Sequence, residues 1–133
     1  MVNAETTIDF RGELCCYHRV SKSKDRTQLL ATLTEIEVAL GDNIERSIEI
    51  RRRVVAFRAA IGEGAQVSDL VATEGQPRTV AMLSANLAIL EDVGSTYRQN
   101  LAHTLRSEGM TIRAIGELFG VTRQRISALL KQG

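Results

Sequence analysis

The side chains with the clearest chemistry lie near the C-terminus. Arg123 and Gln124 are followed at helical spacing by Ser127, Ala128 and Lys131, which predicts one outer helix face without bulky apolar groups. An arginine guanidinium forms paired hydrogen bonds with a guanine edge, and a glutamine amide does so with an adenine edge. We therefore expect this face to read base pairs in the major groove of double-stranded DNA through Arg123, Gln124, Ser127 and Ala128.

The residues before this face predict the element that would hold it. Thr111 and Thr122 are each placed to cap the start of a short helix, and Gly120 fits the turn between them, where a positive φ costs glycine least. Gly116 has no side chain, so the second helix is able to cross close above it. The expected core is apolar and consists of Ile112, Ile115, Phe119, Val121, Ile126, Leu129 and Leu130. This pattern is typical of a helix-turn-helix.

Contacts with phosphates would supply the sequence-independent part of DNA affinity. The residues expected to make them are Thr111, Arg113, Thr122, Arg125, Lys131 and Arg106. The whole chain has 17 Lys and Arg against 16 Asp and Glu, for a net charge of +1, so it is not a general polycation. The segment 93–133 nevertheless carries six basic and two acidic groups, which concentrates positive charge at the C-terminal end.

These C-terminal residues also carry a family resemblance. The run 111–128 resembles the −35-reading helix-turn-helix of bacterial sigma factors through Ile115-Gly116, Phe119, Val121-Thr122-Arg123 and Arg125-Ile126. The wider stretch 51–130 is similar to small helix-turn-helix regulators of actinobacteria, chiefly in the block 119–130. The resemblance implies that Arg123 and Gln124 read bases and that Thr122 contacts a phosphate.

The chain departs from sigma factors in two respects. Ser127 and Ala128 stand where longer polar side chains are usual in the sigma pattern. Nothing upstream resembles the regions with which a sigma factor clamps the polymerase core or melts the promoter. The function expected from these features is a sequence-selective transcription regulator, and the alternative is an interaction protein that docks on RNA polymerase or a sigma factor without reading bases.

The rest of the chain predicts an all-α protein with three regions. Residues 1–26 lack a helical period and are expected to be an arm that is flexible or forms a short hairpin. Residues 27–92 are expected to form a helical region for dimerisation or partner binding, and residues 93–133 the DNA-binding region. In the middle region, Gly41-Asp42-Asn43 interrupts the pattern and predicts a second helix start, with one continuous helix as the alternative.

A long helix is predicted between Pro77 and Glu108, with a possible break at Gly94-Ser95. Its heptad stripe runs through Val80, Leu83, Leu87, Leu90, Gly94, Tyr97 and Leu101. Either the upstream helices or the same helix of a second copy would fill this stripe. Because an exposed stripe of this length promotes association, we expect a homodimer. Its two recognition helices would lie about 34–36 Å apart and favour an inverted repeat.

Several other classes of function find no support in the sequence. It has no Gly-rich phosphate loop, no Ser-His-Asp order and no HExxH motif, so we expect no enzymatic activity and no cofactor. Adjacent Cys15 and Cys16 chelate poorly even with His18 nearby, so we expect no metal site. No apolar run approaches the roughly 20 residues of a membrane span, and the N-terminus lacks a signal-peptide layout. The expected location is the cytoplasm, away from membranes.

Overall fold

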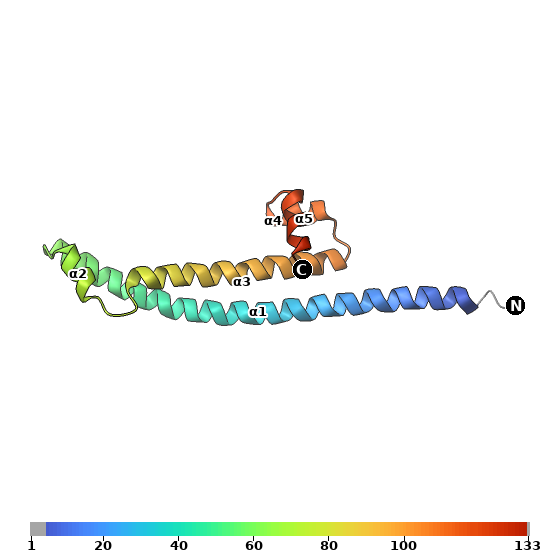
Figure 1. The fold of residues 1–133 in the computed structure, drawn as a ribbon, viewed down its shortest axis with the longest axis horizontal. Helices are drawn as coiled ribbons and strands as arrows, with labels where there is room; N and C mark the ends of the chain where they lie inside the picture. Colours follow the sequence, from blue (N-terminus) through green and yellow to red (C-terminus); the bar gives the residue numbers. More distant parts are fainter. Residues whose placement is uncertain (1–4, 133) are drawn as a thin grey trace. The chain divides into compact units, whose positions relative to one another are not determined.

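The computed structural model describes the backbone of residues 5–132 and the side chains of residues 22–132. This part of the chain forms five helices (Figure 1): α1 (Glu5–Gly62), α2 (Val67–Thr73), α3 (Thr79–Ser107), α4 (Ile112–Phe119) and α5 (Arg123–Lys131). None of the residues 5–132 lies in a strand, which confirms the all-α prediction.

Residues 1–26 are predicted to form an arm that is flexible or a short hairpin, and the hairpin alternative is wrong from Glu5 onward, because α1 already begins there. The segment contains no proline and a single glycine, Gly12, so it offers no strong helix breaker, and the lack of an apolar period does not stop a helix that is already propagating. Residues 1–4 of the predicted arm lie outside the described residues.

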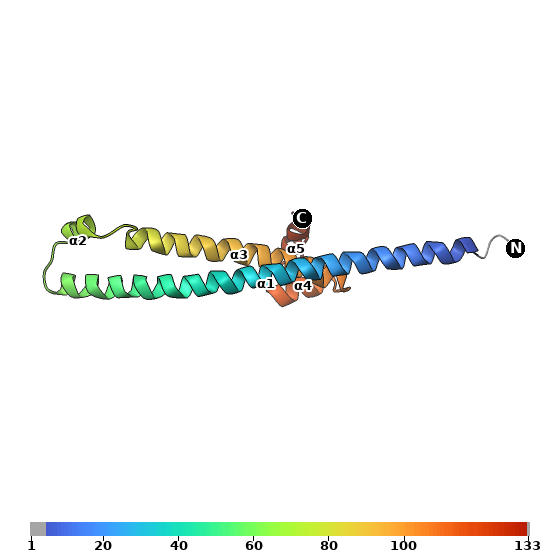
Figure 2. The ribbon, with the colours of Figure 1, turned by 90° about the horizontal axis from the view of Figure 1, so that it is seen from below.

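The contacts divide the chain into two compact units. Unit 1 comprises Met1–Thr34 and Ser95–Gly133, and unit 2 comprises Glu35–Gly94. Each unit therefore contains one segment of α1 and one segment of α3, and these segments lie side by side in both ribbon views (Figures 1 and 2). The helices α4 and α5 belong to unit 1, and α2 belongs to unit 2.

The helix break predicted at Gly41-Asp42-Asn43 is wrong, because α1 passes through these residues without interruption. Tertiary contacts explain the continuity, since Ala39 and Ile50 are buried on either side of the glycine. Arg46 between them donates through Nε to the Oδ1 atom of Asn86 in α3. Packing of this face outweighs the weak helix propensity of a single glycine.

Polar contacts link α1 to the rest of unit 2. Arg53 donates to the carbonyl oxygen of Pro77 at 2.6 Å and lies 3.8 Å from the Glu74 carboxylate. Glu49 accepts from Arg52 and from Arg53, at 2.7 and 2.8 Å respectively. Hydrogen bonds from Arg52 and Arg53 lower the pKa of Glu49 to about 2, so this carboxylate stays ionised at any ordinary pH.

The starts of α2 and α3 depend on different local contacts. Helix α2 follows Gln66, whose side chain forms no capping hydrogen bond. Helix α3 begins at Thr79, after Pro77, and continues unbroken through Gly94-Ser95. The Glu74 carboxylate accepts from the backbone N–H and from the hydroxyl of Thr79, and these hydrogen bonds lower the pKa of Glu74.

In unit 1, two hydrogen bonds between polar groups join α1 to α3. Asn100 donates through Nδ2 to the Thr32 hydroxyl at 2.6 Å, and the Thr104 hydroxyl lies 3.3 Å from the carbonyl oxygen of Asp25. Thr32 and Thr104 are buried. Buried polar groups are costly unless they are paired, so these contacts favour one register of α1 against α3.

Among the helices of the described residues, none has an apolar stretch of the length that a membrane span requires.

Candidate nucleic-acid interface

Local contacts fix both ends of α4, the first helix of the C-terminal pair. Gly109, with φ of +100°, ends the turn after α3, and the Thr111 hydroxyl accepts from the N–H of Ala114 at 3.1 Å. At the other end Gly120 has φ of +66°, a left-handed conformation that only glycine adopts without appreciable cost. The predicted cap at Thr111 and turn at Gly120 are both confirmed.

The turn brings α4 and α5 close together. The N–H of Val121 donates to the carbonyl oxygen of Gly116 at 2.9 Å, and a Cβ atom on Gly116 would lie 3.0 Å from the carbonyl oxygen of Val121. A side chain at this position would push against the backbone of the turn. The predicted close approach at Gly116 is therefore confirmed.

A small apolar core fixes the two helices on the end of α3. Ile115 of α4, Ile126 of α5 and Ala102 of α3 are essentially inaccessible to solvent. Half-buried side chains surround them: Leu105, Met110, Ile112, Phe119, Val121, Leu129 and Leu130. Every core residue predicted for the helix-turn-helix belongs to this cluster. Its other members are Ala102 and Leu105 of α3 and Met110 in the connection between α3 and α4.

The second helix begins with a side-chain cap and presents a polar outer face. The Thr122 hydroxyl accepts from the N–H of Arg125 at 3.3 Å. This cap fixes the first turn of α5, which carries the side chains of Arg123 and Gln124. The exposed residues of α5 are Arg123, Gln124, Arg125, Ala128 and Lys131, while Ser127 is half-buried. The structure thus brings all four predicted base-reading residues onto one short, capped helix.

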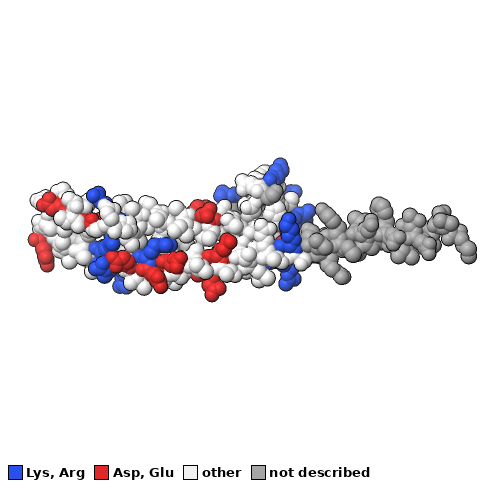
Figure 3. Space-filling model, turned by 60° about the horizontal axis from the view of Figure 1, so that its bottom comes forward, with Lys and Arg blue, Asp and Glu red and all other residues white. Residues whose placement is uncertain are grey.

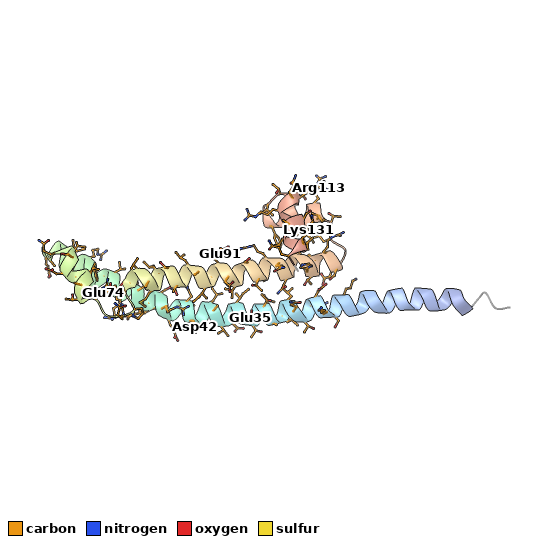
Figure 4. The ribbon with its side chains drawn as sticks, viewed as in Figure 1. Glu35, Asp42, Glu74, Glu91, Arg113 and Lys131 are labelled. Atoms are coloured by element: carbon orange, nitrogen blue, oxygen red, sulfur yellow. The ribbon has the colours of Figure 1, made fainter. Side chains whose placement is uncertain are left out.

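The six predicted phosphate-contacting residues are exposed but have different partners. Arg113 and Lys131 project from α4 and α5 (Figure 4), and Arg113 pairs with Glu117 through Nε at 3.0 Å. Arg106 donates to the carbonyl oxygen of Met110 at 2.9 Å, so its guanidinium also holds the connection between α3 and α4. Thr111 and Thr122 use their hydroxyls as helix caps.

Unit 1 carries further basic groups that the sequence assigned to the N-terminal arm. Lys22, Lys24 and Arg26 of α1 belong to the same unit as the helix-turn-helix. Lys22 and Arg106 line one hollow of about 470 Å³ beside His103, whose Nε2 atom is buried without a hydrogen-bond partner. No sequence signal marks this proximity, because it depends on how α1 packs along α3.

Charge is unevenly divided between the described residues of the two units. In unit 1 the acidic side chains are Asp25, Glu108 and Glu117, against nine basic ones at positions 22, 24, 26, 98, 106, 113, 123, 125 and 131. Figure 3 shows Lys and Arg side chains at the C-terminal helices and the adjacent part of α1, and a second group of Lys and Arg that is mixed with Asp and Glu over unit 2. A surface with this excess of cations attracts a polyanion such as a nucleic acid.

A metal ion is not among the ligands that the side chains at positions 22–132 indicate. Within that range, no group of three or more His, Cys, Asp or Glu residues is placed to hold a metal ion. Cys15, Cys16 and His18 lie outside the residues whose side chains are described. A comparison with known proteins finds no matching family, no matching curated protein and no matching solved structure.

Proposed function

We propose that this protein is a DNA-binding transcription regulator and that α5 reads base edges in the major groove. The observation that carries the proposal is the capped, exposed start of α5, which holds Arg123 and Gln124 above a closed apolar core. In a helix-turn-helix the first residues of the second helix enter the groove. The cations of unit 1 would then lie near phosphates, and a homodimer would favour an inverted repeat.

A second candidate function rests on one apolar side chain. Leu118 of α4 is 64% exposed beside the ion pair of Arg113 and Glu117. An exposed leucine suits a protein partner better than a phosphate backbone, so the second candidate is an interaction protein that docks on RNA polymerase or a sigma factor without reading bases. Two measurements distinguish the two proposals. One is fluorescence anisotropy with random DNA at two salt concentrations, and the other is a pull-down with polymerase. Sequence-blind, micromolar DNA binding together with stable polymerase capture would favour the second.

The Arg113→Ala variant is expected to weaken binding to all DNA sequences by a similar factor. If Arg113 contacts one phosphate, its loss removes one released counterion, so the slope of log Kobs against log salt should become shallower by about 0.9. The ion pair with Glu117 is exposed, so its loss should hardly affect folding. Anisotropy titrations at four or more salt concentrations measure both quantities.

Arg52→Ala is the matched control, because it removes the same charge from unit 2, where the Arg52 side chain is 70% exposed. The control should retain the wild-type slope. An unchanged slope in Arg113→Ala, or an equal change in both variants, would contradict the phosphate contact.

A further inference from the structure

Unit 2 exposes an apolar surface that includes Leu40, Ile44, Val54 and Ile61 of α1 and Leu83 and Leu87 of α3. These six side chains, which we call the open face, are between 45% and 69% exposed. Val54 and Ile61 line the same groove as Leu83, with a volume of about 640 Å³, so the two helices present their apolar residues on one side. A continuous apolar surface of this kind marks an interaction site.

The inner seam of unit 2 fully buries few apolar side chains. Among its hydrophobic side chains only Ala39, Ile50 and Met82 are buried, and the seam also contains the polar pair of Arg46 and Asn86. Ordering a residue costs roughly 1–2 kcal/mol in backbone entropy, which apolar burial must offset. Covering the open face would supply the missing burial.

The charge pattern of α1 indicates that a second copy covers it. Within unit 2, residues 35–45 of α1 carry the acidic groups Glu35, Glu37, Asp42 and Glu45 and no basic group. Residues 46–58 carry Arg46, Arg51, Arg52, Arg53 and Arg58 and one acidic group, Glu49. Glu35 and Asp42 are labelled in Figure 4. An antiparallel copy of α1 would place each acidic half beside a basic half.

The same pairing follows along one row of α1 that passes through Ile44 of the open face. Glu37, Ile44, Arg51 and Arg58 recur every seven residues, so they lie in a single row along α1. In an antiparallel pair Glu37 of one copy would lie near Arg51 or Arg58 of the other, with Ile44 close to the centre. A parallel pair would instead oppose Glu37 to itself and each arginine to itself, which is unfavourable.

The size of the open face also matches a protein interface. At about 1.5 Å per residue, the unit 2 segments of α1 and α3 are about 40 and 24 Å long, and each presents a strip about 10 Å wide. Two copies would bury roughly 1,200 Å² in total, within the range of specific protein interfaces. We propose that two copies of this chain pair through the open face, with their α1 helices antiparallel, to form a four-helix arrangement.

Sedimentation equilibrium of the full chain tests the pairing. Ile44→Glu places a charge at the centre of the interface and should raise the dimer dissociation constant by about 100-fold or more. Val38→Glu is the matched control, because Val38 and Ile44 are both 60% exposed and Val38 lies outside the row. It should remain as dimeric as the wild type. A monomeric wild type, or a dimer that survives Ile44→Glu, would overturn the proposal.

Distances between spin labels test the orientation. In a chain with Cys15→Ser and Cys16→Ser, single labels are placed at Glu45→Cys and at Ala59→Cys, two exposed sites fourteen residues apart. In the antiparallel dimer, the distance between the two labels at residue 59 should exceed that at residue 45 by about 25–40 Å. Equal distances would overturn the antiparallel arrangement.

The sedimentation and spin-label experiments test the pairing independently of DNA binding by α5. An Ile44→Glu monomer that still shows a base preference would support both proposals, whereas a wild-type monomer with a base preference would remove only this one.

Discussion

Ile126→Ala is expected to destabilise the helix-turn-helix by about 2–5 kcal/mol, the usual cost of truncating a fully buried isoleucine. Ile126 lies against Ile115 and Ala102 in a core with few members, so the lost contacts have no substitute nearby. Ile126→Val should cost about 0.5–1.5 kcal/mol. Amide hydrogen exchange of α4 and α5 residues reports the local opening free energy directly.

Leu118→Ala serves as the control for this series, since Leu118 is exposed on the other helix of the same pair. In the Leu118→Ala variant, the opening free energies of the α4 and α5 amides should stay within about 0.5 kcal/mol of the wild-type values. If Ile126→Ala and Leu118→Ala lowered protection equally, the two helices would not be held by the core described above.

Arg123→Ala is expected to lose discrimination at one base pair while leaving the fold intact. A bidentate contact between arginine and guanine contributes roughly 1–3 kcal/mol, so the preference for that base pair should fall by about 5- to 150-fold. The side chain is exposed, and the cap from Thr122 to the N–H of Arg125 does not involve it. Anisotropy with a preferred duplex and its single base-pair variants measures the loss.

Arg125→Ala is the matched comparison. It removes the same charge two residues further along α5, and Arg125 is expected to contact a phosphate. It should weaken binding to every duplex by a similar factor. Equal losses on all duplexes for both variants would refute the base-reading role of Arg123.

The helix-turn-helix could be predicted from sequence because its determinants are local. Thr111 and Thr122 accept from amides three residues ahead, and Gly120 provides a conformation that other residues adopt at a cost. Gly116 and its neighbour across the turn are only five residues apart. Such short-range chemistry leaves the same signature wherever the motif folds.

The upstream helices could not be predicted in the same way. The sequence leaves open whether the upstream helices or a second copy fill the apolar stripe through Leu83 and Leu87. In unit 2 both leucines are exposed, and the inner seam uses Asn86, which meets Arg46 forty residues away. Continuity of α1 through Gly41 likewise depends on packing against α3. Pairings between small and polar side chains leave no periodic signal in one sequence.

Parts of the candidate site also depend on tertiary contacts that the sequence alone does not reveal. The sequence identified the outer face of α5, but it gave no sign that Arg106 would bind the Met110 carbonyl. It also gave no sign that Lys22 would line a hollow with Arg106, because their proximity depends on how α1 packs along α3. The cationic surface of unit 1 is consequently larger than the C-terminal segment alone.

Selection of bound duplexes from a random oligonucleotide pool tests the central claim most directly. If α5 reads bases, the wild-type chain should enrich a defined motif, and Arg123→Ala should lose the preference at one position of it. A homodimer should enrich that motif as an inverted repeat. A pool that stays random after repeated rounds at low salt, where nucleic-acid binding is strongest, would contradict the account.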